Sequence, residues 1–136
     1  MLICSICLTT DMSVEDLDQG INFYNTLFNQ DADVVKHDYA KWMLDEPAVN
    51  FAITEKCGKL GLNHLGFQVD DDDELEAIET RLKQAELSGL KEEKRNCCYA
   101  KSNKYWTMDP ANIPWENFHT LESIATFGDS KEIDIR

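Results

Sequence analysis

The strongest constraint on the fold is an approximate internal repeat. Residues 9–14, Thr-Thr-Asp-Met-Ser-Val, match residues 64–69, His-Leu-Gly-Phe-Gln-Val, at an offset of 55 residues. Residues 42–45, Trp-Met-Leu-Asp, match residues 106–109, Trp-Thr-Met-Asp, at an offset of 64 residues. Each half follows the pattern of a strand, a helix and three further strands. A module of this kind cannot bury its apolar face alone, so the repeat predicts two modules that share a core.

In the first half, alternating side chains predict a strand over residues 5–14, with Thr9 and Asp11 on one face. The segment 13–16, Ser-Val-Glu-Asp, resembles a capping box that starts a helix. The apolar stripe of that helix has helical spacing: Leu17, Ile21, Tyr24 and Phe28. Short strands are expected over residues 32–37, 40–44 and 50–54, with a turn at residues 45–48.

In the second half, a strand is predicted over residues 63–69, and the acidic run 70–73 suits the first turn of a helix. The stripe of this helix is Leu75, Ile78, Leu82 and Ala85. Further strands are expected near residues 90–94, over 97–108 and over 114–120, with a turn at 109–112. A longer loop near residues 92–103 accounts for the difference between the two offsets.

The predicted fold class is therefore α+β, with two tandem β-α-β-β-β modules that form a cupped mixed sheet. The modules are expected at residues 1–55 and 62–120 of a single domain, and residues 121–136 as a polar, loosely attached tail. The concave side of such a sheet is a natural ligand cavity.

Composition excludes several partners. The net charge of −13 argues against nucleic acid and anionic membranes, which are themselves polyanionic. The chain has no apolar run of roughly 18 residues, and its start lacks a basic region, so we interpret the start as a strand or leader and not as a signal peptide. The odd number of cysteines, five, favours free thiols in a reducing cytoplasm.

The repeat narrows the candidate metal ligands. The offset of 55 pairs His64 with Thr9, and the offset of 64 pairs Glu116 with Ala52, which gives four cavity positions. Of these, only His64 and Glu116 have strong ligand chemistry, and histidine with carboxylate suits Fe(II). Thr9 is a poor ligand. Asp11 lies on the face of Thr9, roughly 6–7 Å along the strand, and could take its place only if the strand slipped.

Two further features bear on this site. The adjacent cysteines Cys97 and Cys98 can both bind one thiophilic ion such as As(III) or Cd(II), or they are two small core residues. Basic side chains in the same segment favour the thiolate form: Lys94, Arg95, Lys101 and Lys104. His119 is an odd number of residues from Glu116, so it is expected to face the opposite side of its strand.

At these residues the chain resembles the vicinal-oxygen-chelate superfamily of glyoxalases, bleomycin-resistance proteins and extradiol dioxygenases. Within it, the chain is most similar to the group of cadmium-induced proteins and organoarsenical carbon–arsenic lyases. Six segments between Val14 and Phe118 carry the resemblance: residues 23–28 (FYNTLF), 39–42 (YAKW), 63–66 (NHLG), 97–100 (CCYA), 104–106 (KYW) and 114–116 (PWE).

The resemblance implies Fe(II)- and dioxygen-dependent cleavage of the C–As bond of trivalent organoarsenicals such as methylarsenite. It implies metal ligands at His64 and Glu116, and arsenic-binding thiols at Cys97 and Cys98. Tyr99 and Lys104 are the expected substrate-binding neighbours of the thiols. Zn(II) or Ni(II) are alternative occupants of the metal site, and a homodimer is common in the superfamily.

The chain departs from the family pattern at Thr9, where the pattern has histidine or glutamine. Two alternatives to an intact lyase therefore stay open. One is a non-enzymatic protein that binds As(III) or Cd(II) through Cys97 and Cys98. The other is a member of the fold that binds a small molecule without metal. Glyoxalase activity is disfavoured because Ala52 replaces the glutamate that such an enzyme would use as a ligand.

Overall fold

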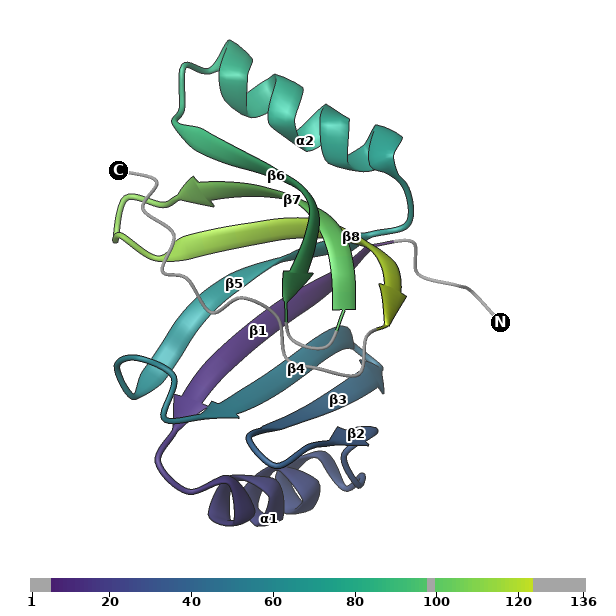
Figure 1. Cartoon of the computed structure of the whole chain (residues 1–136), viewed down its shortest axis with the longest axis vertical. Coiled ribbons are helices and arrows are strands. Elements are labelled where there is room, and N and C mark those ends of the chain that lie inside the picture. Colours follow the sequence, from purple (N-terminus) through teal and green to yellow (C-terminus); the bar gives the residue numbers. More distant parts are fainter. Residues whose placement is uncertain (1–5, 98–99, 124–136) are drawn as a thin grey trace. The chain divides into compact units, whose positions relative to one another are not determined.

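The computed structural model describes residues 6–97 and 100–123 of the 136-residue chain. The elements run in the order β1 (Ile6–Val14), α1 (Leu17–Phe28), β2 (Val34–Val35), β3 (Tyr39–Asp45), β4 (Ala48–Glu55), β5 (Gly61–Val69), α2 (Asp72–Gln84), β6 (Gly89–Cys97), β7 (Ala100–Met108) and β8 (Pro114–Ser123) (Figure 1). Strand, helix and three strands occur twice, which confirms the predicted α+β class and the repeated β-α-β-β-β order.

The chain divides into two compact units. The first unit is Cys7–Leu65, and the second is Gly66–Arg136 together with Met1–Ile6. The boundary between them falls inside β5. The first unit therefore holds α1 and β1 to β4, and the second holds α2 and β6 to β8.

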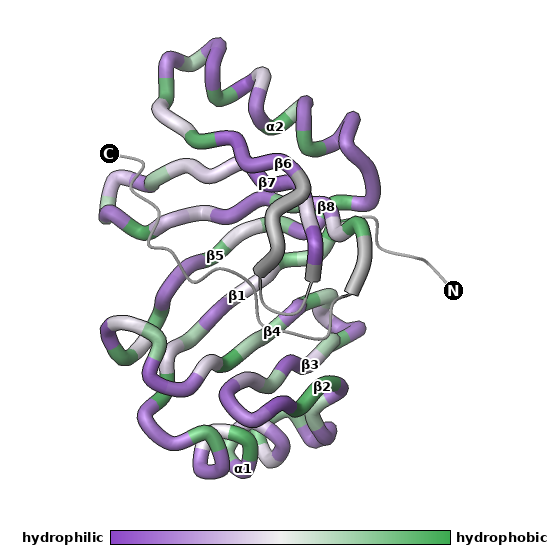
Figure 2. Tube along the Cα trace, viewed as in Figure 1, coloured by the Kyte–Doolittle hydropathy of each residue, from purple (hydrophilic) through white to green (hydrophobic). Residues whose placement is uncertain are grey.

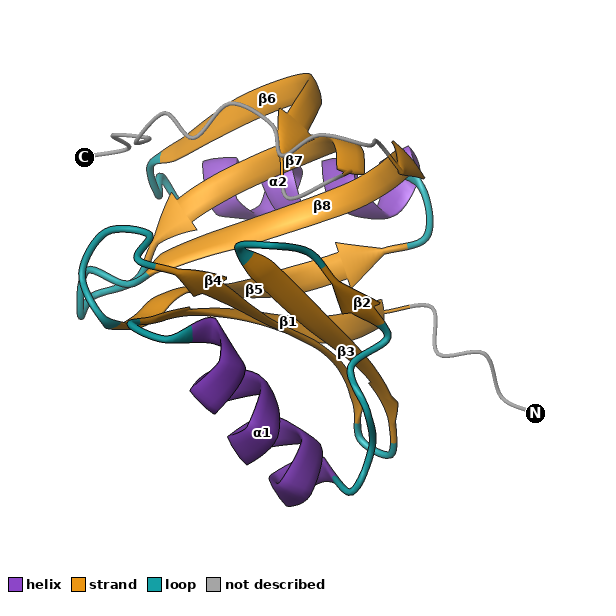
Figure 3. Ribbon diagram, turned by 60° about the horizontal axis from the view of Figure 1, so that its bottom comes forward, coloured by secondary structure: helices purple, strands orange, loops and turns teal. Residues whose placement is uncertain are grey.

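In the first unit the strands are ordered β2-β3-β4-β1, with β1 parallel to β4 and β3 antiparallel to β4. The helix α1 lies along one face of these strands (Figure 3). Its N-cap is Asp16, whose carboxylate accepts a hydrogen bond from the backbone N–H of Gln19 at 3.0 Å. The predicted capping box beginning at Ser13 is thus wrong, because β1 continues through Ser13 to Val14. At the other end Asn29 adopts the left-handed conformation that closes helices.

The core of the first unit lies between α1 and the strands. Leu17, Ala40, Trp42 and Ile53 are buried, and the predicted α1 stripe packs against them. The indole N–H of Trp42 donates to the side-chain oxygen of Asn25 at 2.9 Å, and that oxygen also accepts the backbone N–H of Ala32 at 3.0 Å. One α1 side chain therefore satisfies a buried indole and a loop amide.

In the second unit the strands are ordered β8-β7-β6, and both neighbouring pairs are antiparallel. The helix α2 contacts all three strands. It is hydrophilic along most of its length, with isolated apolar positions (Figure 2). Two of its stripe residues, Leu75 and Ile78, are buried with Val69 and Tyr105, and Leu82 packs beside them. The fourth expected stripe residue, Ala85, is exposed because the helix ends before it.

Three element boundaries differ from the prediction. The strand expected over residues 32–37 is reduced to Val34–Val35. No long loop fills residues 92–103 in the described part of the chain, because β6 continues to Cys97 and β7 starts at Ala100. Register shifts at residues 92–95 and 101–102 accommodate extra residues within the strands, as β-bulges do. The last strand, β8, continues to Ser123, into the segment expected to be a tail.

No helix of the described residues is long and apolar enough to cross a membrane.

Candidate functional site

The first unit has a buried polar face on β1, opposite its helix-packed face. Thr9, Asp11 and Ser13 are 5%, 7% and 3% exposed. Met12 and Val14, on the other face of β1, pack against the core of the first unit. The predicted alternation of the two faces is therefore confirmed. The sequence did not show that the polar face would also be buried.

The carboxylate of Asp11 is the centre of this polar face. It accepts a hydrogen bond from the hydroxyl of Thr54 on β4 at 3.3 Å and one from the side-chain amide of Asn63 on β5 at 3.0 Å. Its Oδ2 lies 3.9 Å from Nδ1 of His64.

Asp11 therefore lies near His64 in the register of the structure, and the expectation that it could replace Thr9 as a ligand only if β1 slipped stays a prediction. The physical reason for this proximity is that neighbouring strands lie only about 4.8 Å apart, so side chains meet across diagonal positions as well as direct ones. Sequence reasoning also missed Thr54 and Asn63 as partners of this carboxylate. The signal for Asn63 was present, since it begins the Asn-His-Leu-Gly segment.

Two hydroxyls on the same face of β1 lack hydrogen-bond partners. Oγ1 of Thr9 and Oγ of Ser13 are buried and unsatisfied, as is Oγ1 of Thr10 on the other face. A buried polar group without a partner costs about 1–3 kcal/mol. Ala52, the fourth cavity position expected from the repeat, pairs with Asp11 in the register of β1 and β4 and brings no ligand atom. The donors on this face thus come from Asp11 and His64, with hydroxyls beside them.

In the second unit, Glu116 is buried in an ion pair. Its Oε2 lies 2.9 Å from Nζ of Lys104, and the two residues are 6% and 4% exposed. The ammonium group of Lys104 also lies 5.8 Å from the ring centroids of Trp106 and Phe118. The antiparallel register of β7 and β8 creates this arrangement, because it pairs Lys104 with Phe118 and Trp106 with Glu116. The expected metal ligand and an expected substrate-binding residue are therefore in direct contact.

His119 faces the helix side of β8, as its odd spacing from Glu116 predicted. Its Nδ1 lies 3.2 Å from Oδ1 of Asp72 on α2. The side-chain amide of Asn103 donates to the same oxygen at 2.9 Å. Both hydrogen bonds, the one from Asn103 more than the one with His119, hold the pKa of Asp72 below its ordinary value. His119 thus fixes the start of α2 to the strands and takes no part in the face that holds Glu116.

The structure explains why the Asn-His-Leu-Gly segment ends in glycine, at Gly66. A Cβ atom built on Gly66 would clash with the backbone oxygen of Glu116. The backbones of β5 and β8 approach too closely here for any side chain. The glycine therefore has a structural role at the residue that carries the expected ligand.

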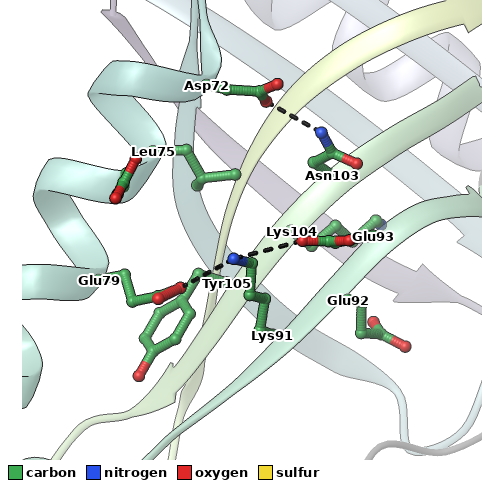
Figure 4. A pocket seen from close by; sticks show the side chains of 10 residues that line it. Asp72, Leu75, Glu79, Lys91, Glu92, Glu93, Asn103, Lys104 and Tyr105 are labelled. Atoms are coloured by element: carbon green, nitrogen blue, oxygen red, sulfur yellow. Dashed lines mark hydrogen bonds and ion pairs between the residues drawn. The ribbon is translucent and has the colours of Figure 1, made fainter.

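A cavity lies between α2, β6 and β7 of the second unit, and Lys104 is among its lining residues (Figure 4). Its volume is about 130 Å³, little more than a few water molecules. Lys91 bridges its walls, with Nζ at 3.8 Å from Glu79 and 3.3 Å from Glu93. The remaining acidic lining residues are Asp72, Glu76 and Glu92.

The expected thiols are only partly described. Cys97 is the last residue of β6 and pairs with Ala100 of β7. Cys98 and Tyr99 lie outside the described residues. Within residues 6–97 and 100–123, no three or more His, Cys, Asp or Glu side chains form a group that could hold a metal ion. His64 belongs to the first unit and Glu116 to the second.

The fold identifies the class of protein. An extradiol dioxygenase from B. fuscum shares 16% identity with a TM-score of 0.65, over 88% of this chain and 33% of its own. A Mn(II)-bound glyoxalase from Novosphingobium aromaticivorans shares 12% identity with a TM-score of 0.63, over 93% of this chain and 41% of its own. Methylmalonyl-CoA epimerase from Mycobacterium tuberculosis shares 17% identity with a TM-score of 0.64, over 89% and 93%. The protein therefore has the vicinal-oxygen-chelate fold.

Sequence relatives narrow this class. A probable trivalent organoarsenical cleaving enzyme from Bacillus subtilis is 38% identical over 80% of this chain and 76% of its own length. A trivalent organoarsenical cleaving enzyme from Bacillus sp. strain MD1 is 35% identical over 83% and 72%. The cadmium-induced protein CadI of Mycobacterium tuberculosis is 35% identical over 86% and 78%. No family model matches the chain. The chain belongs to the family of trivalent organoarsenical cleaving enzymes and CadI proteins.

Proposed function

We propose that this protein is a metal-dependent enzyme that cleaves the carbon–arsenic bond of trivalent organoarsenicals. The observation that carries the proposal is the family relationship, since two relatives named for this activity share 35–38% identity over most of both chains. The fold supports it, because the same fold occurs in a dioxygenase and in a Mn(II)-bound glyoxalase. The expected thiol pair Cys97 and Cys98 supplies the affinity for arsenic that such a substrate requires.

The donor chemistry of the chain fits a divalent metal. The polar face of the first unit offers the imidazole of His64 and the carboxylate of Asp11, beside hydroxyls that lack partners. Imidazole and carboxylate donors suit Fe(II), and also Zn(II) or Ni(II). We propose His64 and Glu116 as ligands. Fe(II), when bound, supplies an open position for dioxygen beside the substrate.

The ion pair between Lys104 and Glu116 bears on metal binding. In the absence of metal its ammonium group neutralises the carboxylate of Glu116 at 2.9 Å. A metal that used Glu116 as a ligand would compete with this ammonium group for the same oxygen. The released Lys104 would then be a cation close to the ligand, where an anionic substrate or product group can pair with it.

For the substrate, we propose that Cys97 and Cys98 hold the trivalent arsenic as thiolates, with Tyr99 beside them. The neighbouring positive charges of Lys101 and Lys104 favour the thiolate form. Holding the arsenic at two sulfurs fixes the orientation of the bond to be broken, which contributes to catalysis by restricting the bound geometry.

The test is release of inorganic arsenite from methylarsenite by protein reconstituted with Fe(II) and exposed to air. Arsenite is measured by chromatography with arsenic-specific detection. We expect release by the wild-type chain and its loss in Cys97→Ser and His64→Ala. Cys57→Ser is the matched control, because Cys57 is half-buried and lies outside both proposed sites. Absence of arsenite from iron-loaded wild-type protein in air would contradict the proposal.

A second candidate function is non-enzymatic binding of As(III) or Cd(II). Thr9 favours it, because a hydroxyl without a partner stands where the repeat predicts a metal ligand. The similarity to CadI proteins, whose name refers to cadmium induction, is compatible with it. Tight binding of As(III) or Cd(II) that is unchanged in Glu116→Ala, without release of arsenite from methylarsenite, would select this function over the first.

A further inference from the structure

We propose that Asp11 positions the imidazole of His64 and keeps the proton of the neutral ring on Nδ1, so that the lone pair of the ring lies on Nε2. Asp11 is then a positioning residue, which acts through His64. The inference rests on the proposed function in one respect, because it specifies the nitrogen atom through which His64 would bind a metal. Both residues belong to the first unit, and so do all the contacts used.

The two side chains face each other through defined atoms. Oδ2 of Asp11 lies 3.9 Å from Nδ1 of His64, and the side chains are 9% and 18% exposed. This distance is longer than a direct hydrogen bond, so the carboxylate acts on the ring through its charge. An N–H group at Nδ1 is attracted by that charge, whereas a lone pair at Nδ1 is repelled by it. Because burial limits screening by water, the proton is favoured on Nδ1.

The carboxylate of Asp11 is itself held from two strands. The hydroxyl of Thr54 on β4 donates to Oδ1 at 3.3 Å, and the side-chain amide of Asn63 on β5 donates to Oδ2 at 3.0 Å. Each oxygen therefore accepts a hydrogen bond, which restricts rotation of the carboxylate. Asn63 directly precedes His64, so the strand that carries the histidine also holds the group that faces its ring.

The position of this proton decides what His64 can do. A neutral imidazole binds a metal only through the ring nitrogen that carries no proton. With the proton on Nδ1, that nitrogen is Nε2. Metal-binding histidines in proteins are commonly fixed in this way, because a neighbouring carboxylate sets the tautomer and the orientation of the ring. Asp11 has the charge and the location for this role.

The test reads the proton directly in metal-free protein. NMR spectra of protein with ¹⁵N-labelled histidine distinguish a protonated from an unprotonated ring nitrogen by its chemical shift. The chain has three histidines, so the signals of His64 are identified by their absence from the spectrum of His64→Gln. Spectra are recorded well above the ordinary histidine pKa of about 6.5, where the neutral ring is favoured. We expect the wild-type ring of His64 to carry its proton on Nδ1.

Two variants isolate the effect of the charge. Asp11→Asn keeps the shape of the side chain and removes its charge, so we expect loss of the preference for Nδ1. Ser13→Ala is the matched control, because it removes a buried polar group from the same face of β1 without a change of charge. The His64 signals of this control should stay those of wild type. Near-ultraviolet circular dichroism confirms folding of each variant.

The second measurement is the affinity for Fe(II), determined without oxygen by competition with a coloured chelator. Loss of an outer group that orients a histidine ligand costs about 10–100-fold in metal affinity. We expect a loss of this size in Asp11→Asn and an unchanged affinity in Ser13→Ala.

The outcomes separate this inference from the proposed function. A proton on Nε2 in wild type, or a proton that stays on Nδ1 in Asp11→Asn, overturns the inference whether or not metal binds. If the tautomer depends on Asp11 but wild-type protein binds no Fe(II), the proposed metal dependence fails and the positioning of His64 is supported. If wild type and Asp11→Asn bind Fe(II) equally well, Asp11 does not serve the site and the inference is overturned.

Discussion

The ion pair of Lys104 and Glu116 offers a quantitative test of the structure. The two charges are 2.9 Å apart, and both side chains are less than a tenth exposed. We consider Lys104→Met, Glu116→Met and the double variant. Methionine keeps most of the length of either side chain and removes the charge. Each single variant removes the charge that lies 2.9 Å from the other buried charge.

The expected magnitude follows from this burial. At 2.9 Å and an effective dielectric constant of about 20, the attraction is roughly 6 kcal/mol, and desolvation of both groups offsets much of it. Removing one partner of a buried pair costs about 3–5 kcal/mol, whereas replacing both with apolar residues is often neutral. With a urea dependence of about 2 kcal/mol per molar, each single variant should lower the unfolding midpoint by roughly 2 M.

The assay is urea unfolding of metal-free protein, followed by tryptophan fluorescence. The double variant should lie close to wild type, which gives a coupling energy of several kcal/mol in the double-mutant cycle. Lys83→Met is the matched control, because Lys83 is 64% exposed in an i,i+4 pair with Glu79, and such pairs contribute about 0.3–0.5 kcal/mol. If Lys104→Met destabilises the protein no more than Lys83→Met does, the buried pairing is refuted.

Three further predictions concern single contacts. Asn25→Leu leaves a buried indole N–H and a loop N–H without their acceptor, so it should lower the free energy of unfolding by about 2–4 kcal/mol, and a loss below 0.5 kcal/mol in urea would contradict the contact. Gly66→Ala places a methyl group on the backbone of Glu116 and should cost at least about 3 kcal/mol in the same assay, whereas wild-type stability would refute that close approach. Asn103→Ala removes the main hydrogen bond that lowers the pKa of Asp72, so an NMR titration should show this pKa rising. Because that pKa is depressed in the folded state, its contribution to stability is present above the ordinary pKa and is lost as pH falls through the lowered one. An unchanged pKa would exclude the bond.

The repeat determined most of the fold. Matching segments at offsets of 55 and 64 residues gave the β-α-β-β-β order of both halves, and the helical stripes gave the faces of α1 and α2 that pack inward. The predictions that were wrong concern the ends of helices and strands and the extra residues of the second half. The sequence could not show that the extra residues near Arg95 extend two strands through bulges, since a bulge depends on pairing with the partner strand. The start of α1 was misplaced for a similar reason, because β1 continues through Ser13.

The sequence by itself also determined which residues have the chemistry of a metal site, and that His119 faces away from Glu116. Only the tertiary structure decided which charged groups meet. Alternation along a strand fixes the face of a side chain, but cross-strand contacts depend on register and side-chain reach. Those two factors bring Asp11 to within 3.9 Å of His64 and place Lys104 against Glu116 at 2.9 Å. For this reason the thiols and the histidine could be identified from the sequence, whereas the proximity of Asp11 to His64 could not.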